Sequence, residues 1–186
     1  MTPPTTTVAI SLGSNIGNRA GAIRQALRLI EHSDGVSQLN TSGLYSTTPV
    51  GYTDQPEFIN CAATLETTCQ PEQLLALFRG IEQRLGRTKR ERWRQREIDI
   101  DILLFGDQSI ATPTLTIPHP EMGNRAFVLV PLSQIAPSLR HPGVGLTVAQ
   151  LLDQLPDRSG IEPMEEEDTP LATDVVNFPR HIRWRG

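Results

Sequence analysis

Asp99 and Asp101 are two carboxylates separated by one residue inside an otherwise apolar run, Ile98 to Leu104. In a β-strand, residues i and i+2 point to the same face, so both carboxylates would converge while Ile100 points the other way. Two carboxylates held close together repel each other unless a cation or a proton lies between them. The oxygen ligands favour Mg²⁺, which completes its shell with water and phosphate oxygens. The alternative is a pair of solvated aspartates on an exposed sheet face.

A strongly basic segment directly precedes this run. Against the single acid Glu91, it contains Arg84, Arg87, Lys89, Arg90, Arg92, Arg94 and Arg96. Polyphosphate chemistry requires cations on the phosphate oxygens beside a metal held by carboxylates. Trp93 adds a stacking face within the segment. The alternatives are an RNA-binding loop and a solvated run of charge.

His119 lies between Pro118 and Pro120. The prolines would hold it rigidly, which suits a donor to a phosphate oxygen, although a lone histidine is more often structural. The sequence contains no Walker-type glycine-rich loop with its lysine. The similar segment 13–17 lacks that lysine and is predicted to be a tight turn near the site.

The elements that must position these residues follow from hydrophobic spacing. Apolar residues at helical intervals predict two amphipathic helices, and short β-rich runs predict four strands. The strands are expected at 8–12, 36–45, 58–67 and 98–105, and the helices at 19–31 and 71–85. The order β-α-β-β-α-β predicts an α+β fold with a ferredoxin-like core, an antiparallel sheet with both helices on one face. The polar stretch 46–57 is predicted to be a long functional loop.

The rest of the chain is predicted to extend this core. We expect a hairpin around Gly106 and Asp107, then helices from Ala126 and over 148–155, which would cover the other sheet face. From Pro156 the chain becomes more polar and is expected to be a partly disordered or loosely docked tail. The predicted division is a catalytic domain, 1–158, and a tail of unknown role, 159–186.

Length and composition limit the class of protein. A chain of 186 residues with 38% hydrophobic content fits one compact domain, and its net charge of −4 argues against a protein built for nucleic acid or anionic membrane. Cys61 and Cys69 are too few for a disulfide framework. No secretory leader or long apolar segment is visible, so a cytoplasmic protein is expected.

An ordered set of motifs resembles the 6-hydroxymethyl-7,8-dihydropterin pyrophosphokinases, which act in folate synthesis. Each motif is weak by itself, but their order matches that family from Val8 to about Pro142. They are Leu12-Gly13-Ser14-Asn15, Asp54-Gln55-Pro56, Phe58-Ile59-Asn60, Glu82 with Gly86-Arg87, Glu91-Arg92-Trp93, Arg96 with Asp99-Ile100-Asp101-Ile102-Leu103, and Pro118-His119-Pro120. The resemblance implies a ferredoxin-like core and transfer of pyrophosphate from ATP to the pterin hydroxymethyl group, with release of AMP.

The resemblance also implies residue roles. Asp99 and Asp101 would bind two Mg²⁺ ions, and Arg87 and Arg96 would join them as catalytic residues. The residues implied to bind ATP are Leu75, Glu82, Lys89, Arg92, Trp93, Ile102, Thr116, His119 and Arg125. The residues implied to bind the pterin are Thr47, Pro49, Val50, Phe58, Asn60, Asp99 and Phe127.

Three further expectations complete the interpretation. The segment 86–96 is expected to be mobile without ligands and to close over the triphosphate, because its like charges repel one another. The partners would be ATP and the pterin, with no nucleic acid and no membrane, and the protein would be a monomer. Two alternatives remain: an RRM-like RNA-binding module, which shares the element order but would need aromatic residues where Asp99 and Asp101 stand, and a palm-like two-metal nucleotidyl-transferring enzyme.

Overall fold

The fold is known from a computed structural model, which describes residues 4–48, 56–86 and 96–165. Its helices and strands alternate much as the hydrophobic spacing predicts. The strands are β1 (Thr6–Ser14), β2 (Val36–Thr41), β3 (Tyr45–Thr47), β4 (Phe58–Thr67), β5 (Asp99–Phe105), β6 (Ile110–Ala111), β7 (Thr116–Ile117) and β8 (Ile161–Pro163). The helices are α1 (Arg19–Glu31), α2 (Pro71–Arg84), α3 (Ala126–Ile135) and α4 (Val148–Gln154), with a 3₁₀ turn, η1 (Met122–Asn124).

The main sheet is antiparallel and runs in the order β5-β1-β4-β3-β8, with β2 paired to the other end of β4. The strands β1 and β4 pair along their whole lengths, from Thr6 opposite Thr67 to Ser14 opposite Ile59. The predicted ferredoxin-like α+β core is therefore confirmed, and β5, which carries both aspartates, is an edge strand of the sheet.

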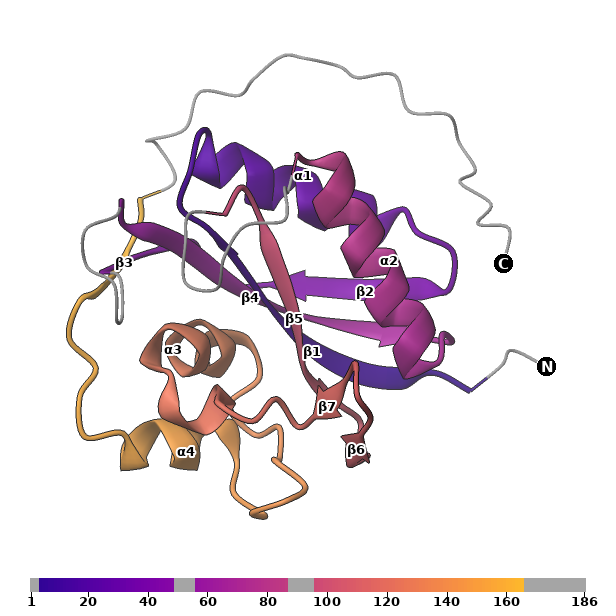
Figure 1. Ribbon diagram of the computed structural model, residues 1–186. Helices are drawn as coiled ribbons and strands as arrows, with labels where there is room; N and C mark the ends of the chain where they lie inside the picture. The colour runs from indigo at the N-terminus through magenta and orange to yellow at the C-terminus, as the bar shows by residue number, and fades with distance from the viewer. Residues whose placement is uncertain (1–3, 49–55, 87–95, 166–186) are drawn as a thin grey trace.

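The helices α1 and α2 cover one face of the sheet, as Figure 1 shows. Asn18 begins α1 by accepting a 3.0 Å hydrogen bond from Gly21 N, and Pro71 occupies the first turn of α2, where its missing N–H costs no hydrogen bond. The apolar residues of both helices pack on alternate residues of β1 and β5, including Ile100 and Ile102. This packing leaves the intervening residues of those strands for the opposite face.

A second, smaller core lies on the opposite face. The helices α3 and α4 pack there on Ala9, Ala62 and Leu103, as the sequence predicts. Thr147 begins α4 in a capping box, since its hydroxyl accepts from Gln150 N and its N–H donates to the Gln150 side chain. The smaller core covers only part of this face and leaves the end of β5 near Asp99 to polar side chains.

Two sequence predictions about strands were wrong in detail. The strand expected at 36–45 is broken into β2 and β3, because the Ser42 hydroxyl accepts the Ala62 N–H and interrupts the backbone ladder. The hairpin expected around Gly106 and Asp107 forms later, between β6 and β7. A turn does occur at Gly106, but its N–H donates to Thr7 O of β1, and the hairpin closes where Thr112 N bonds Leu115 O.

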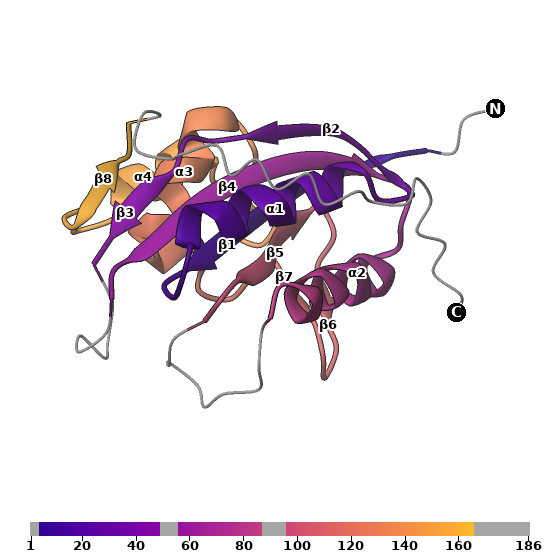
Figure 2. The same cartoon turned by 90° about the horizontal axis from the view of Figure 1, so that it is seen from above.

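The strand β8 was not predicted. It pairs with β3 beyond the predicted domain boundary at residue 158, and Figure 2 shows the two strands side by side at one end of the sheet. Both cysteines are free, with Cys61 buried in the main core. Within residues 4–48, 56–86 and 96–165, the longest helices are too short and too polar to cross a membrane.

Candidate active site

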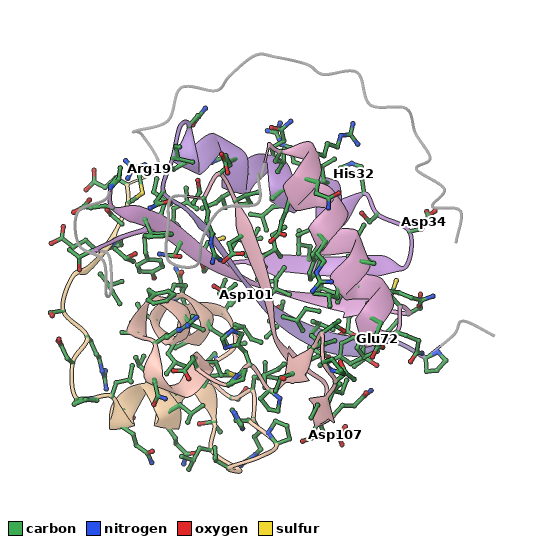
Figure 3. The ribbon with its side chains drawn as sticks, viewed as in Figure 1. Arg19, His32, Asp34, Glu72, Asp101 and Asp107 are labelled. Atoms are coloured by element: carbon green, nitrogen blue, oxygen red, sulfur yellow. The ribbon has the colours of Figure 1, made fainter. Side chains whose placement is uncertain are left out.

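Asp99 and Asp101 lie on the face of β5 opposite the main core. Ile98, Ile100 and Ile102 alternate with them and are buried under α1 and α2. The aspartate side chains keep 21% and 43% of their surface exposed, so both remain accessible to a ligand. Figure 3 shows Asp101 near the centre of the view, well separated from the peripheral acids Glu72 and Asp107. The prediction that the two aspartates share one face of the strand, opposite the isoleucines, is confirmed.

A third carboxylate holds the strand between the two aspartates. Glu82, on α2, is 4% exposed, and its Oε1 accepts a 2.8 Å hydrogen bond from Ile100 N. Because β5 is an edge strand, this carboxylate satisfies a backbone donor on the side that has no neighbouring strand. The Glu82 carboxylate therefore fixes the backbone at the residue between the two aspartates.

Arg96 reaches Asp99 in an ion pair, with 31% of its own side chain exposed. Its backbone is held from both sides by Asn15, which lies at the turn after β1. Arg96 N donates to Asn15 Oδ1 at 2.7 Å, and Asn15 N donates to Arg96 O at 3.1 Å. Since Asn15 is fully buried, these two hydrogen bonds tie the Arg96 backbone to the core at the end of β1.

His119 faces the same carboxylates from the segment after β7. Its Nε2 lies 4.0 Å from Asp101 Oδ2, while its Nδ1 accepts a 3.1 Å hydrogen bond from Glu121 N. In the neutral ring the proton is therefore on Nε2, which points to the aspartates. Burial and the nearby Arg125 guanidinium lower the pKa of His119 below its usual 6.5, so the ring is a neutral donor at neutral pH.

A buried polar pair lies two strands away from the aspartates. Asn60 Nδ2, on β4, donates a 2.6 Å hydrogen bond to Thr47 Oγ1, on β3. The two residues are 4% and 3% exposed, and Phe58 follows the same face of β4. Three of the residues predicted to bind the second substrate are thus gathered at one end of the sheet.

Gly13 connects the two groups. Across the strands it lies opposite Asn60 on β4 and opposite Asp99 on β5, so the three residues form one line over the sheet. A Cβ at Gly13 would meet Asn60 Oδ1 at 2.7 Å and the Phe58 ring at 3.9 Å. The absence of a side chain at Gly13 therefore lets the Asn60 amide lie close over β1, between the strands of Asn60 and Asp99, which are about 10 Å apart.

Arg125 and Phe127 lie at the start of α3, next to this face. The Arg125 guanidinium lies 5.7 Å from the centroid of the Phe127 ring, at which distance the cation is attracted to the ring. Both side chains are half-buried rather than enclosed in the core. Their exposed surfaces are available to a ring or a phosphate.

The other predicted ATP residues are more scattered. Leu75 is partly buried on α2, Thr116 is exposed on β7, and the Ile102 side chain is buried in the main core. Any contact of Ile102 with a ligand would have to come from its backbone. Pro49, Val50, Arg87, Lys89, Arg92 and Trp93 lie outside the described residues, as does most of the segment 86–96.

The donor set suits a hard cation that also binds a substrate. The two aspartates supply carboxylate oxygens on one accessible face, which fits Mg²⁺. In the described part of the chain, no three His, Cys, Asp or Glu side chains are arranged so that they could hold a metal ion by themselves. A cation here would therefore need oxygens from water or from a phosphate to complete its shell, as Mg²⁺ usually does at phosphate sites.

Sequence reasoning missed the roles of Asn15 and Gly13. Both belong to the segment 13–17, which was interpreted only as a tight turn, whereas Gly13 is still part of β1 and Asn15 directly follows the strand. The signal for Asn15 was present, because a turn that follows a strand neighbouring β5 must lie close to Arg96. The backbone role of Glu82 was also missed, since it depends on which edge of β5 faces α2.

Comparison with known proteins identifies relatives of the chain. The family model described as 7,8-dihydro-6-hydroxymethylpterin-pyrophosphokinase (HPPK) matches residues 9–137. A 2-amino-4-hydroxy-6-hydroxymethyldihydropteridine pyrophosphokinase from Bacillus subtilis is 47% identical over 126 residues, covering 68% of this chain and 75% of the relative. The protein of the same name from Haemophilus influenzae is 38% identical over 156 residues, covering 84% and 97%.

Solved structures show the same fold at low sequence identity. A crystal structure of HPPK-DHPS in complex with substrates superposes with a TM-score of 0.62 at 15% identity, covering 81% of this chain and 43% of the other. Wild-type Plasmodium falciparum HPPK-DHPS gives a TM-score of 0.61 at 18% identity, with coverages of 81% and 41%. This chain therefore spans less than half the length of those chains.

Proposed function

The chain belongs to the 7,8-dihydro-6-hydroxymethylpterin-pyrophosphokinase family, and we propose on that premise that the face around Asp99, Asp101 and Asn60 is its catalytic centre. The family transfers pyrophosphate from ATP to the hydroxymethyl group of 6-hydroxymethyl-7,8-dihydropterin in folate biosynthesis. The observation that carries the proposal is the line Asn60, Gly13, Asp99 across three strands, which puts a ring-binding amide and a phosphate-side carboxylate on one face.

On the phosphate side, Asp99 and Asp101 would hold two Mg²⁺ ions. When bound, these ions neutralise the negative charge of the triphosphate. Arg96, positioned by Asn15, adds a cation beside Asp99, and the His119 Nε2–H, which lies near Asp101, would donate to a phosphate oxygen. Arg125 is within reach as a second cation on the same side.

On the pterin side, Asn60 and Thr47 would accept and donate hydrogen bonds at the ring edge. Phe58 and Phe127 would stack on the two faces of the ring, which suits a flat heterocycle with a polar rim. The hydroxymethyl group would then point along the line past Gly13 toward Asp99. The position of Thr47 supports roles for its neighbours Pro49 and Val50, which lie outside the described residues.

The reaction follows from this placement. The hydroxymethyl oxygen attacks the β-phosphorus, the bond from that phosphorus to the oxygen of the α-phosphate breaks, and AMP leaves, while Asp101 is the side chain that we assign as acceptor of the hydroxyl proton. In-line placement and neutralised charge provide most of the acceleration in such a transfer. Arg87 would join Arg96 on the transferring group.

The remaining predicted ATP residues would serve the nucleoside end. Leu75 and Thr116 would contact the nucleoside with their side chains, and Ile102 would contact it with its backbone. Glu82 would contribute by holding the outer edge of β5 at Ile100. Lys89, Arg92 and Trp93 would close over the triphosphate. That the protein acts as a monomer, that it is cytoplasmic, and that residues 1–158 form its catalytic unit remain predictions.

The alternatives from other classes have less support. An RRM-like module would need stacking rings on the strand that carries Asp99 and Asp101, and a palm-like nucleotidyl transferase would leave the Asn60 and Thr47 pair without a purpose. The family match over residues 9–137 favours neither.

One assay tests the reaction. The protein is incubated with Mg²⁺, ATP and 6-hydroxymethyl-7,8-dihydropterin, and the nucleotides are separated. We expect AMP in an amount equal to the pterin diphosphate formed, and none without the pterin. Formation of ADP would indicate single phosphoryl transfer and would contradict the proposal.

A further inference from the structure

The strand β8 converts β3 from an edge strand into an interior strand of the sheet. Tyr45, Ser46 and Thr47 lie opposite Pro163, Glu162 and Ile161 in this order. Beyond the strand, Thr48 N donates to Gly160 O at 3.0 Å, and Met164 N donates to Leu44 O at 2.9 Å. The segment 160–164 therefore holds β3 at both of its ends.

The two segments approach each other closely at Gly160. This residue has a φ of +71°, and a Cβ there would overlap the Thr48 hydroxyl and lie 3.3 Å from Thr48 Cβ. Glycine at this position permits both the left-handed backbone and the close contact with the residue after Thr47.

Thr47 connects the segment 160–164 to the proposed pterin site. Its hydroxyl accepts the 2.6 Å hydrogen bond of Asn60, and both side chains are buried. Ile161 lies directly opposite Thr47 and so projects from the same face of the sheet. A shift of β3 would change the position of the Thr47 hydroxyl and, with it, the orientation of the Asn60 amide.

We propose that the segment 160–164 is a positioning element for the pterin side of the active site, acting through Gly160 on Thr48 and through Ile161 on Thr47. This inference rests on the proposed function, because it assigns Thr47 and Asn60 to the pterin. The segment lies beyond residues 9–137, which the family model matches. Its strand β8 lies at the edge of the sheet opposite to β5, the strand of Asp99. It acts on pterin binding and leaves ATP binding unchanged.

The test compares two glycine substitutions that differ in one respect. Gly160→Ala adds a methyl group against Thr48, whereas Gly145→Ala adds one where nothing lies within 4 Å, and both glycines have a φ of +71°. Both substitutions therefore place alanine at the same positive φ, and the difference between the variants reports on the contact. We expect Gly160→Ala to raise the KM for the pterin by about fivefold or more, with the KM for ATP unchanged. Gly145→Ala is expected to leave both constants unchanged.

A second substitution distinguishes the contact from general destabilisation. Thr48→Ala removes the hydroxyl and methyl group that the new Cβ would meet, so adding it to Gly160→Ala should restore most of the pterin KM. If Gly160→Ala does not fold, Ile161→Ala keeps the backbone and should raise the pterin KM alone.

The outcomes are distinct. Equal increases in both KM values, or equal behaviour of the two glycine variants, would overturn the positioning role while the wild-type activity stands. Absence of pterin-dependent AMP from the wild-type protein would overturn the proposed function and this inference with it.

Discussion

Glu82 Oε1 accepts a 2.8 Å hydrogen bond from the backbone N–H of Ile100, the residue between the two aspartates of the site. The carboxylate is buried on α2, and the strand that it contacts is an edge strand. A side chain from a helix thus completes the hydrogen bonding of the strand between the two aspartates that we propose as metal ligands.

Replacing Glu82 should separate its backbone role from its charge. Glu82→Leu removes the acceptor and leaves a buried N–H unsatisfied, so we expect a loss of about 1–3 kcal/mol in the free energy of unfolding. Glu82→Gln keeps an amide oxygen and should lose less. Urea denaturation of the metal-free protein measures both values. Equal losses for the two variants would show that the hydrogen bond to Ile100 is not what Glu82 contributes.

Substitution of either aspartate should abolish turnover and preserve the fold. Asp99→Ala and Asp101→Ala remove ligands on the phosphate side, so AMP release should fall by well over tenfold, while the melting temperature without metal stays close to that of the wild type. Asp107→Ala is the matched control, because Asp107 is exposed and distant from the site (Figure 3). Activity above about a tenth of wild type in both variants would mean that the metals bind elsewhere.

Gly13→Ala should displace the Asn60 amide from its place over β1. The new Cβ would lie 2.7 Å from Asn60 Oδ1, so the amide must move and pterin affinity should fall by about tenfold. Calorimetry on the protein saturated with Mg²⁺ and a non-hydrolysable ATP analogue measures this affinity. In the control Gly123→Ala, the added group meets only Leu151 at an ordinary 3.8 Å, and no change is expected. An unchanged pterin affinity in Gly13→Ala would show that the pterin does not bind along the line Asn60, Gly13, Asp99.

Phe127 should contribute to the pterin more than to ATP. Phe127→Ala removes a half-buried ring beside Arg125, so we expect a loss of about 1–3 kcal/mol in pterin binding and little change for ATP. Phe58→Ala should behave in the same way if both rings stack on the substrate. Calorimetry with each ligand separates the effects, and comparable losses for both ligands would identify Phe127 as a core residue.

The lowered pKa of His119 should make the metal-free protein less stable in mild acid. Between the lowered folded-state pKa and the unfolded value near 6.5, the unfolded chain binds more protons. Stability is therefore complete above about pH 6.5 and falls as the pH drops through this window. His119→Gln removes the titration and should flatten the dependence of the free energy of unfolding on pH from 7 to 5. An identical slope in the variant would assign the dependence to other groups.

The sequence determined the local parts of this protein. The alternation of aspartate and isoleucine in 98–102 was enough to predict that Asp99 and Asp101 share one face, because strand geometry has a period of two. Helical spacing likewise predicted α1 and α2 almost to the residue, and the β-rich run at 58–67 matched β4. These features depend on neighbours along the chain, so the pattern in the sequence is sufficient.

The tertiary structure decided what lies opposite what. The line Asn60, Gly13, Asp99 depends on the registers of two strand pairs. The two hydrogen bonds between Asn15 and Arg96 join residues that are 81 positions apart in the sequence. The strand β8 has only three residues, and its polar surroundings gave no β signal, so its place beside β3 comes from backbone hydrogen bonds rather than from side-chain pattern. Such pairings are selected by the total packing of the sheet and its two cores, and no local spacing encodes them.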